Sequence, residues 1–288
     1  MHDRAGTLAS SLEGRHVVIT GANTGIGKET ARALARRGAS LVLACRSEDK
    51  TRPVIQEIAR ETGNNKIHFV PLDLGELASV RRAAEAILAR GEPIHVLINN
   101  AGLAGQRGVT KDGFEQTFGV NHLGHYLFTR LLLDAIEKSA PARIVHVASK
   151  AHYRTKRIDF DALRRPTATT TGVPEYGVSK LCNVLFSSEL ARRLEGKQVT
   201  SNALHPGVIA SDVWREIPWP FRGVMKLFMK SNEEGARTSL YCATAPELEG
   251  VTGRYYDDEK EREPSALGRD EELARELWER SAEWAGLT

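Results

Sequence analysis

The sequence predicts an α/β Rossmann fold: one doubly wound, mostly parallel sheet of about seven strands, with helices on both of its faces. Short runs of β-branched and apolar residues alternate with longer amphipathic stretches, the order expected of parallel strands and crossover helices. The runs are apolar almost throughout, as in strands covered on both sides. They occupy residues 16–20, 41–45, 67–70, 94–98, 143–147 and 199–204, with a last strand at Tyr255 and Tyr256.

The amphipathic stretches between these runs are predicted to be helices. No repeat, low-complexity tract or shift in composition divides the chain, so we expect a single domain over residues 1–288. The helical stretches cover residues 27–37, 54–61, 77–90, 113–137, 178–194 and 270–287, and two longer irregular stretches cover 150–174 and 213–232.

The composition is that of an ordinary globular protein, with 41% hydrophobic and 27% charged residues. A formal net charge of +3 is too small to indicate a nucleic-acid partner. Cys45, Cys182 and Cys242 are far apart and form no C-x-x-C pair, which favours a reducing compartment over a disulfide framework or a zinc site. No stretch has the apolar core of a secretory signal or the ~18 apolar residues of a membrane span. We therefore expect a cytoplasmic protein without a transmembrane anchor.

A glycine-rich turn follows the first predicted strand and leads into a helix, with the spacing G-x-x-x-G-x-G. Glycines let the backbone approach a pyrophosphate, and the free N–H groups and dipole of the helix N-terminus favour an anion. The simpler interpretation is a turn without a ligand, but its position after the first strand favours a dinucleotide site. The predicted contacts are Gly21, Asn23, Thr24, Gly25, Ile26 and Gly27.

The end of the second strand indicates which dinucleotide binds. An acidic residue there would hold the ribose 2′-hydroxyl of NAD, whereas an arginine accommodates the 2′-phosphate of NADP. This strand ends in Cys45 and Arg46, without a carboxylate at either position. The alternative is that Arg46 is an incidental surface residue; the pattern favours NADP(H).

Tyr176 and Lys180 are four residues apart, so a helix would place both on one face. A free tyrosine titrates near ~10, and a nearby cation lowers that pKa toward the range useful for acid–base catalysis. Ser149 follows the fifth predicted strand, and ligands bind at the carboxyl ends of the strands in such sheets. Each signal is weak alone and gains weight from its position.

Together these motifs resemble the short-chain dehydrogenase/reductase superfamily over essentially the whole chain. The matching residues are 20–27, Asp73 and Leu74, residues 99–102, Asn121, Ser149, Tyr176 with Lys180, and Pro206 with Gly207. The chain is most similar to the retinol dehydrogenase-like branch, through residues 44–46, 120–125 and 205–207 and the long gap between Ser149 and Tyr176. The resemblance implies an NADP(H)-dependent oxidoreductase acting on the carbonyl or alcohol carbon of a small lipophilic aldehyde or ketone.

The resemblance also implies residue roles. Tyr176 would donate or accept the substrate proton, and Lys180 would lower the pKa of Tyr176 and hold the nicotinamide ribose. Ser149 would orient the carbonyl oxygen, and Asn121 would hold a water that links Lys180 to solvent. The other cofactor contacts would be Asp73, Leu74, Asn100, Ala101, Gly102, Pro206, Gly207, Ile209 and Ser211, which stands where the family usually has Thr. The residues placed at the substrate are Leu103, Ser149, Trp214 and Trp219.

An aromatic and methionine-rich stretch at about residues 212–235 favours a lid over an apolar substrate pocket. The alternatives are a peripheral membrane contact or a subunit interface, which would suit a homodimer. Animal members of the resembled branch often begin with a membrane-anchoring helix, and we expect none here.

His122 and His125 form an H-x-x-H pair, but no carboxylate or cysteine is spaced to complete a tetrahedral metal site. A packed helical pair is therefore favoured over a metal site. Two other functions would use the same fold: a nicotinamide-sensing regulatory protein without turnover, and a scaffold. The presence of Asn121, Ser149, Tyr176 and Lys180 favours the enzyme.

Overall fold

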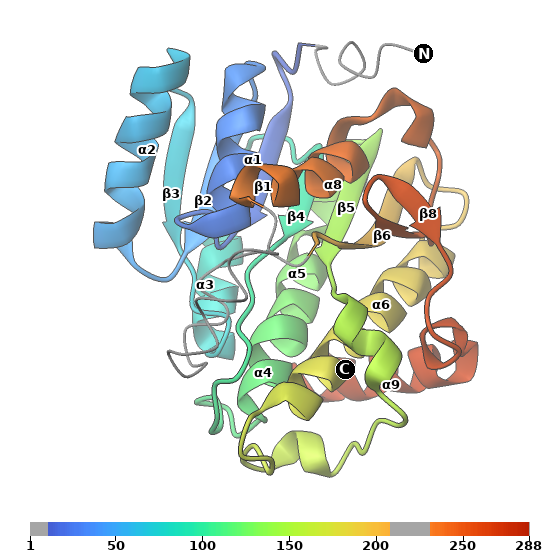
Figure 1. Cartoon of the computed structure of the whole chain (residues 1–288). Helices are drawn as coiled ribbons and strands as arrows, with labels where there is room; N and C mark the ends of the chain where they lie inside the picture. Colours follow the sequence, from blue (N-terminus) through green and yellow to red (C-terminus); the bar gives the residue numbers. More distant parts are fainter. Residues whose placement is uncertain (1–10, 208–230, 288) are drawn as a thin grey trace.

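The computed structural model describes residues 11–207 and 231–287, and it places one sheet between two layers of helices (Figure 1). The eight strands lie in the order β3-β2-β1-β4-β5-β6-β7-β8, and every neighbouring pair is parallel except β7 with β8. The predicted doubly wound, mostly parallel sheet is confirmed. Its strands are β1 (His16–Thr20), β2 (Ser40–Cys45), β3 (Ile67–Pro71), β4 (Val96–Asn99), β5 (Ala142–Val147), β6 (Val199–His205), β7 (Tyr255–Asp257) and β8 (Lys260–Arg262).

The eighth strand was not predicted, because β8 is short, charged and exposed and has no apolar pattern. It pairs antiparallel with β7 through a two-residue turn at Asp258 and Glu259. Both turn residues have positive φ, 54° and 60°, as a type I′ hairpin requires. Neither is glycine, so the usual sequence signal for such a turn is missing.

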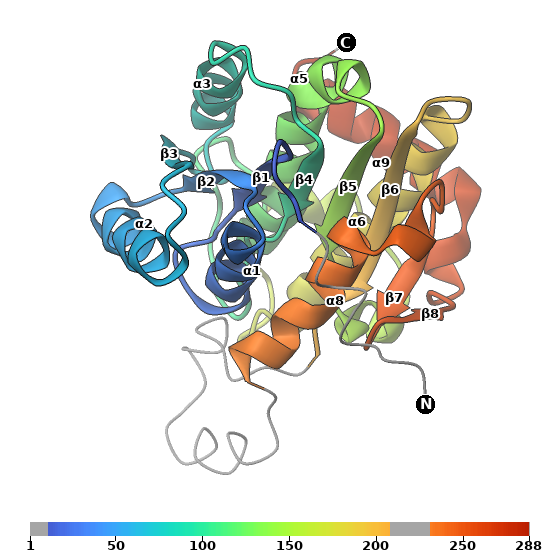
Figure 2. The same cartoon turned by 90° about the horizontal axis from the view of Figure 1, so that it is seen from above.

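Helices cover both faces of the sheet, as the sequence predicts (Figure 2). The helices α1, α2 and α8 pack on one face, and α3, α5 and α6 pack on the other, with α9 lying against α6. The α-helices are α1 (Gly25–Arg36), α2 (Glu48–Thr62), α3 (Leu77–Leu88), α4 (Gln116–Phe118), α5 (Gly124–Lys138), α6 (Val173–Arg193), α8 (Asn232–Thr244) and α9 (Glu271–Trp284). Shorter turns are η1 (Gly119–Leu123), η2 (Lys150–Arg154), η3 (Ala162–Arg164), η5 (Pro246–Leu248) and η6 (Leu267–Arg269).

Each face has its own hydrophobic core. Leu34 of α1 and Ile58 of α2 are fully buried against one face, and Leu127 of α5 and Leu185 of α6 are fully buried against the other. Strands with apolar residues on both faces are required to fill both cores, which explains why the runs do not alternate.

The site lies where the strand order reverses. After β1 the chain builds β2 and β3 on one side, and it then returns to place β4 on the other side of β1. The loops that leave β1 and β4 therefore diverge at the carboxyl edge of the sheet. Open α/β sheets bind ligands in the crevice between such loops, and we use that term for this edge.

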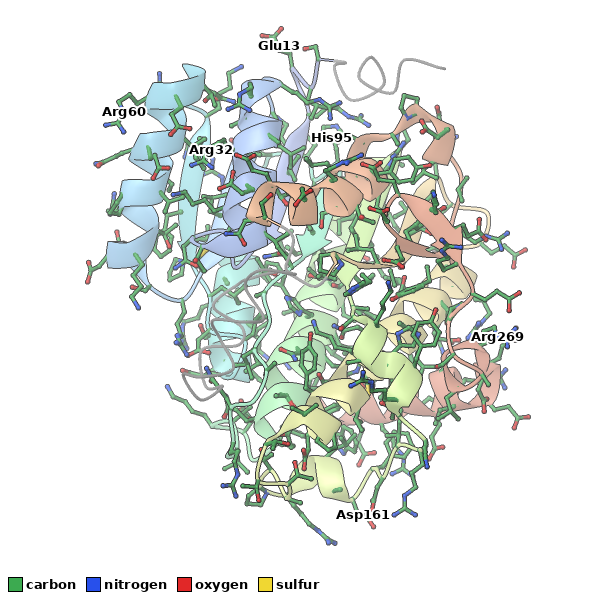
Figure 3. All side chains as sticks on the ribbon, in the orientation of Figure 1. Glu13, Arg32, Arg60, His95, Asp161 and Arg269 are labelled. Carbon is green, nitrogen blue, oxygen red and sulfur yellow. The ribbon has the colours of Figure 1, made fainter. Side chains whose placement is uncertain are left out.

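Ion pairs hold α2 against α1. Lys28 Nζ lies 2.8 Å from Glu57 Oε2, and Arg32 Nε lies 2.8 Å from Glu61 Oε2. Arg32, labelled in Figure 3, also contacts Glu57 through a second nitrogen. The network holds α2, which begins two residues after Arg46, against the helix that follows the glycine turn.

Three histidines are buried among the strands and helices of the α5/α6 face. His122, His125 and His146 are each at most 2% exposed. Burial lowers their pKa values from 6.5 to about 3, 4 and 3, respectively. All three are therefore neutral in the folded protein at neutral pH, whereas in the unfolded chain they titrate near ~6.5.

Acid should destabilise the protein through these histidines. The contribution of the neutral histidines to the free energy of unfolding is complete above about pH 6.5 and is lost as pH falls toward 4. In that range the histidines bind protons in the unfolded chain and do not bind them in the folded protein. Urea unfolding between about pH 6 and 5 should show a loss of up to about 4 kcal/mol per pH unit, at 1.36 kcal/mol per proton. His146→Phe preserves a ring against Phe186 and should reduce that slope by about one proton. An unchanged slope in this variant would contradict the assignment.

Candidate active site

The glycine turn after β1 packs directly on the loop after β4. Gly21 and Gly25 have positive φ, 67° and 55°. A Cβ on Gly21 would lie 2.8 Å from Ala101 Cα, and one on Gly27 would lie 2.5 Å from Asn100 Nδ2. Only glycine fits this close approach, so the turn and residues 100–101 form one wall of the crevice.

The helix that follows the turn has an N-terminus suited to an anion. Its N-cap residue, Thr24, makes no capping hydrogen bond with its side chain, and the first turn of α1 holds no acidic residue. By contrast, α2, α8 and α9 each have a side-chain cap and acidic residues in the first turn. The first amides of α1 therefore fit the negative charge of a pyrophosphate.

The end of β2 borders the same turn. Cys45 is buried, its thiol interacts with the backbone of Ala22 and Asn23, and burial raises its pKa. Arg46 is exposed, and within the described residues no carboxylate pairs with it. Ser47 then caps α2, accepting a hydrogen bond from Lys50 N at 3.4 Å. Positions 45 and 46 thus hold one cation and no carboxylate, and Glu48 and Asp49 follow in the first turn of α2.

The ends of β3 and β4 complete the nucleotide side. Asp73 Oδ1 accepts a hydrogen bond from Gly75 N at 2.9 Å, and Leu74 is buried. Asn100 donates from its backbone N to Thr20 Oγ1 at 2.9 Å and from Nδ2 to Thr20 O at 2.8 Å. Ala101 N donates to the same Thr20 oxygen at 2.9 Å. The predicted contact residues thus follow neighbouring strands at one edge of the sheet.

Asn121 lies in η1, a π-helical turn between α4 and α5, and its side chain is fully buried. It accepts from Leu103 N at 2.9 Å and donates to Leu103 O at 2.9 Å, and it also donates to Ser179 Oγ at 2.9 Å. Asn121 therefore fixes the loop after Gly102 and links it to α6. Wide π turns of this kind are frequent at functional sites.

Tyr176, Lys180 and Ser149 meet at the carboxyl end of β5. Tyr176 and Lys180 lie one turn apart on α6, and both are buried. Lys180 Nζ lies 5.7 Å from the centre of the Tyr176 ring and donates to Val147 O at 2.8 Å. The Ser149 hydroxyl forms a hydrogen bond with the Tyr176 phenol. A Cβ on Gly102 would lie 3.3 Å from Lys180 Nζ, so the cofactor-side loop touches this group.

The electrostatics of this group differ from the expectation for the sequence. Burial raises the pKa of Tyr176 above its ordinary 10, and the hydrogen bond with Ser149 opposes this rise. Burial lowers the pKa of Lys180 from 10.5 to about 7. Lys180 does not lower the pKa of Tyr176 here, because Lys180 is itself desolvated and its ammonium is directed to a carbonyl.

The long segment between Ser149 and Tyr176 is held at two points. Thr167 Oγ1 donates to the buried carboxylate of Glu115 at 2.5 Å, just before α4. Glu175 accepts from Ala168 N at 3.1 Å and from Thr169 N at 2.8 Å, one residue before Tyr176. The last residues of the segment are therefore fixed to the N-cap of α4, which leads into η1 and Asn121, and to the first turn of α6, which carries Tyr176.

Several predicted residues lie outside the described parts of the chain. Pro206 and Gly207 follow β6 at the carboxyl edge, and Gly207 has a φ of 100°. Ile209, Ser211, Trp214, Trp219 and most of the predicted lid lie outside the described residues, and positions 232–235 of that lid form the start of α8.

The histidine pair is occupied by protein contacts. His122 Nε2 lies 3.0 Å from Ser281 Oγ on α9, and His125 contacts Thr20 and Asn121. Over residues 11–207 and 231–287 no group of three or more His, Cys, Asp or Glu residues could hold a metal. Within the same ranges no helix has the length and apolar character needed to cross a bilayer.

Sequence reasoning missed three contributors: the Thr20 hydroxyl, Ser179 and His125. Thr20 stood inside the glycine motif, and His125 stood four residues after Asn121, so both lay within recognised patterns. Their partners could not be found from spacing, because the Thr20–His125 contact joins residues 105 positions apart.

This fold and crevice define a Rossmann-type oxidoreductase that binds a nicotinamide dinucleotide. The chain belongs to the short chain dehydrogenase family, whose model matches residues 15–159. It is 44% identical to retinol dehydrogenase 13 of Homo sapiens, over 96% of this chain and 86% of that protein. It is 45% identical to retinol dehydrogenase 12 of Mus musculus, over 98% and 89%. A crystal structure of an uncharacterized protein from Mycobacterium Paratuberculosis has a TM-score of 0.77 at 33% identity, covering 96% of both chains.

Gly27→Ala should weaken binding of NADPH at least tenfold, because the added methyl meets Asn100 Nδ2 and Gly21 O, each at 2.5 Å. Titration calorimetry measures the dissociation constant, and circular dichroism checks folding. Gly91→Ala is the matched control: Gly91 has positive φ, but a Cβ there meets nothing within 4 Å. It should cost about 1 kcal/mol of stability and leave NADPH affinity unchanged. Equal affinities in the two variants would contradict the turn's assigned role.

Proposed function

We propose that this protein catalyses NADP(H)-dependent hydride transfer to or from the carbonyl or alcohol carbon of a small lipophilic aldehyde or ketone, with Tyr176 as the proton-transfer residue. One observation carries the proposal. Tyr176, Lys180 and Ser149 form a buried group at the end of β5, in contact with the loop that leaves β4 beside the glycine turn. Proton chemistry and dinucleotide recognition thus share one crevice.

The residues present fit a nicotinamide dinucleotide. The pyrophosphate would lie on residues 21–27, and the adenine would lie near Asp73. The nicotinamide ribose would be held by Tyr176 and Lys180, with Asn100, Ala101 and Gly102 lining the crevice between. A bound nicotinamide supplies or accepts the hydride, and the protein's own groups handle the proton.

In the reducing direction Tyr176 acts as a general acid. Its raised pKa keeps the phenol protonated at neutral pH, so it can donate the Oη proton to the carbonyl oxygen as negative charge develops there. Ser149 Oγ, already hydrogen-bonded to that phenol, orients the same oxygen. In the oxidising direction the phenol would first have to release its proton, and the resulting phenolate would then take the proton of the alcohol.

Lys180 serves the proton supply. With a pKa of about 7, it gains and loses a proton near neutral pH. Its Nζ lies beside Gly102, which Asn121 and Leu103 hold in place. A water held at Asn121 would connect Lys180 to solvent and restore the proton that Tyr176 donates.

The proposed preference for NADP(H) rests on the end of β2. A carboxylate there would repel the 2′-phosphate, and Cys45 provides none. Arg46 is exposed beside the turn and supplies a charged hydrogen-bond donor to that phosphate.

The proposed substrate class rests on the wall of the crevice and on the relatives. Val109 and Val173 are 45% and 41% exposed, among the few large hydrophobic side chains left open to solvent in the described residues. Val173 lies one turn before Tyr176, and the loops that bear the two valines touch at Gly105 and Gly172. The names of the relatives indicate that they act on retinol, a lipophilic alcohol.

Tyr176→Phe should lower kcat by about 10²- to 10⁴-fold, because it removes only the hydroxyl that transfers the proton. NADPH consumption with aldehydes of increasing chain length measures turnover, and calorimetry should show little change in NADPH affinity. Tyr153→Phe is the matched control, since Tyr153 is 44% exposed and its hydroxyl contacts only Glu263 O within the described residues. Full activity of Tyr176→Phe would exclude the catalytic role, and a wild type without turnover would favour a regulatory protein.

NADPH should bind at least tenfold more tightly than NADH, the factor expected of a charge-assisted hydrogen bond worth about 1.5–3 kcal/mol. Arg46→Ala should weaken NADPH binding and leave NADH binding nearly unchanged, and Cys45→Asp should shift preference toward NADH. Arg52→Ala on α2 is the control, because its exposed side chain pairs with Glu48. Equal wild-type affinities for the two dinucleotides would overturn the cofactor assignment and leave the reaction class standing.

A further inference from the structure

A buried hydrogen-bond chain connects the end of β1 to the π turn that carries Asn121. Thr20 Oγ1 lies 2.8 Å from His125 Nε2, and His125 Nδ1 lies 3.0 Å from Asn121 O. The side chain of Thr20 and all of Asn121 are fully buried, and His125 is 2% exposed. No water competes for these groups, so each proton in the chain has a defined place.

Donor counting fixes the direction of every bond. The Thr20 hydroxyl has one proton and two lone pairs, and the amides of Asn100 and Ala101 already donate to it, each at 2.9 Å. Its own proton is therefore left for His125 Nε2, which must accept. A neutral imidazole that accepts at Nε2 carries its proton at Nδ1, and that proton is donated to Asn121 O. Burial of the ring, which disfavours the imidazolium, agrees with the neutral form.

We propose that His125, fixed as the Nδ1–H tautomer, is a positioning residue that sets the backbone of Asn121 relative to the dinucleotide-lining loop at Asn100 and Ala101. The proposal rests on the proposed function, because it assigns cofactor contact to one end of this hydrogen-bond chain and proton transfer to the other end. His125 touches neither ligand. It acts through Thr20 on the nucleotide side and through Asn121 on the Tyr176 side.

Each half of the imidazole can be replaced separately. The amide of a glutamine reaches the position of Nε2, so His125→Gln keeps an acceptor for Thr20 and loses the donor to Asn121 O. The amide of an asparagine reaches the position of Nδ1, so His125→Asn keeps that donor and leaves the Thr20 proton without an acceptor. The two variants therefore separate the two ends of the chain.

The expected results are opposite for the two variants. His125→Asn should weaken NADPH binding about tenfold, the effect of one unmet buried hydrogen bond, with kcat at saturating NADPH nearly unchanged. His125→Gln should retain NADPH affinity within about twofold and lower kcat about tenfold.

His122→Gln is the matched control on the same buried turn, since His122 contacts Ser281 on α9 and neither Thr20 nor Asn121. It should lower the melting temperature and leave both NADPH affinity and kcat within about twofold of wild type. Thermal unfolding of all variants separates local repositioning from loss of the fold.

Nitrogen-15 NMR of the wild-type protein tests the tautomer without any turnover, since Nδ1–H and Nε2–H imidazoles have distinct shifts. An Nδ1–H signal for His125 is expected, and an Nε2–H signal would overturn the proposal, as would equal changes in affinity and kcat in the two His125 variants. If the wild type turns over no substrate, the proposed function fails. The tautomer of His125 and the affinities of its variants for NADPH and NADH still decide whether His125 positions Thr20 and the loop at Asn100 and Ala101.

Discussion

The rest of the site depends on the hydrogen bonds that the Thr20 hydroxyl accepts from the loop after β4. Thr20 ends β1 at the point where the strand order reverses, and its hydroxyl accepts the amides of Asn100 and Ala101 from the neighbouring β4. Without it, the half-buried amide of Ala101 would lose its partner, and the amide of Asn100 would keep only Ile98 O, at 3.0 Å. The same bonds hold the loop after β4 against the end of β1, where the glycine turn begins.

The burial needed to build this crevice also sets its chemistry. Closing Tyr176 and Lys180 away from water raises the pKa of the phenol and lowers the pKa of the ammonium. At neutral pH the phenol is therefore in its protonated form. Lys180 lies beside Gly102, so the buried Tyr176 and Lys180 pair is in direct contact with the loop that leaves β4.

Most of the fold and many of the site residues could be predicted because they follow local patterns. Apolar runs located β1 to β7, position after a strand located Ser149 and the glycine turn, and the family resemblance supplied Asp73. The hairpin to β8 could not be predicted, since Asp258 and Glu259 adopt positive φ without glycine. The pKa of Tyr176 moved opposite to expectation, because four-residue spacing indicates a shared face and says nothing of desolvation. The partners of His125 required the tertiary fold.

Two carboxylates, those of Glu115 and Glu175, anchor the segment between Ser149 and Tyr176. The residues at the anchors are fixed, and the residues between them are freer to change. Glu115 and Glu175 bind the last residues of the segment through Thr167, Ala168 and Thr169, and its first residues form η2 beside Ser149. Changes of length or polarity between those points would reshape the approach to the crevice and leave the register of α6 intact. Because Leu163 is buried and Ile158 and Phe160 pack against the core, such changes would fall on the exposed positions between them and would need no compensating change at Ser149 or Tyr176.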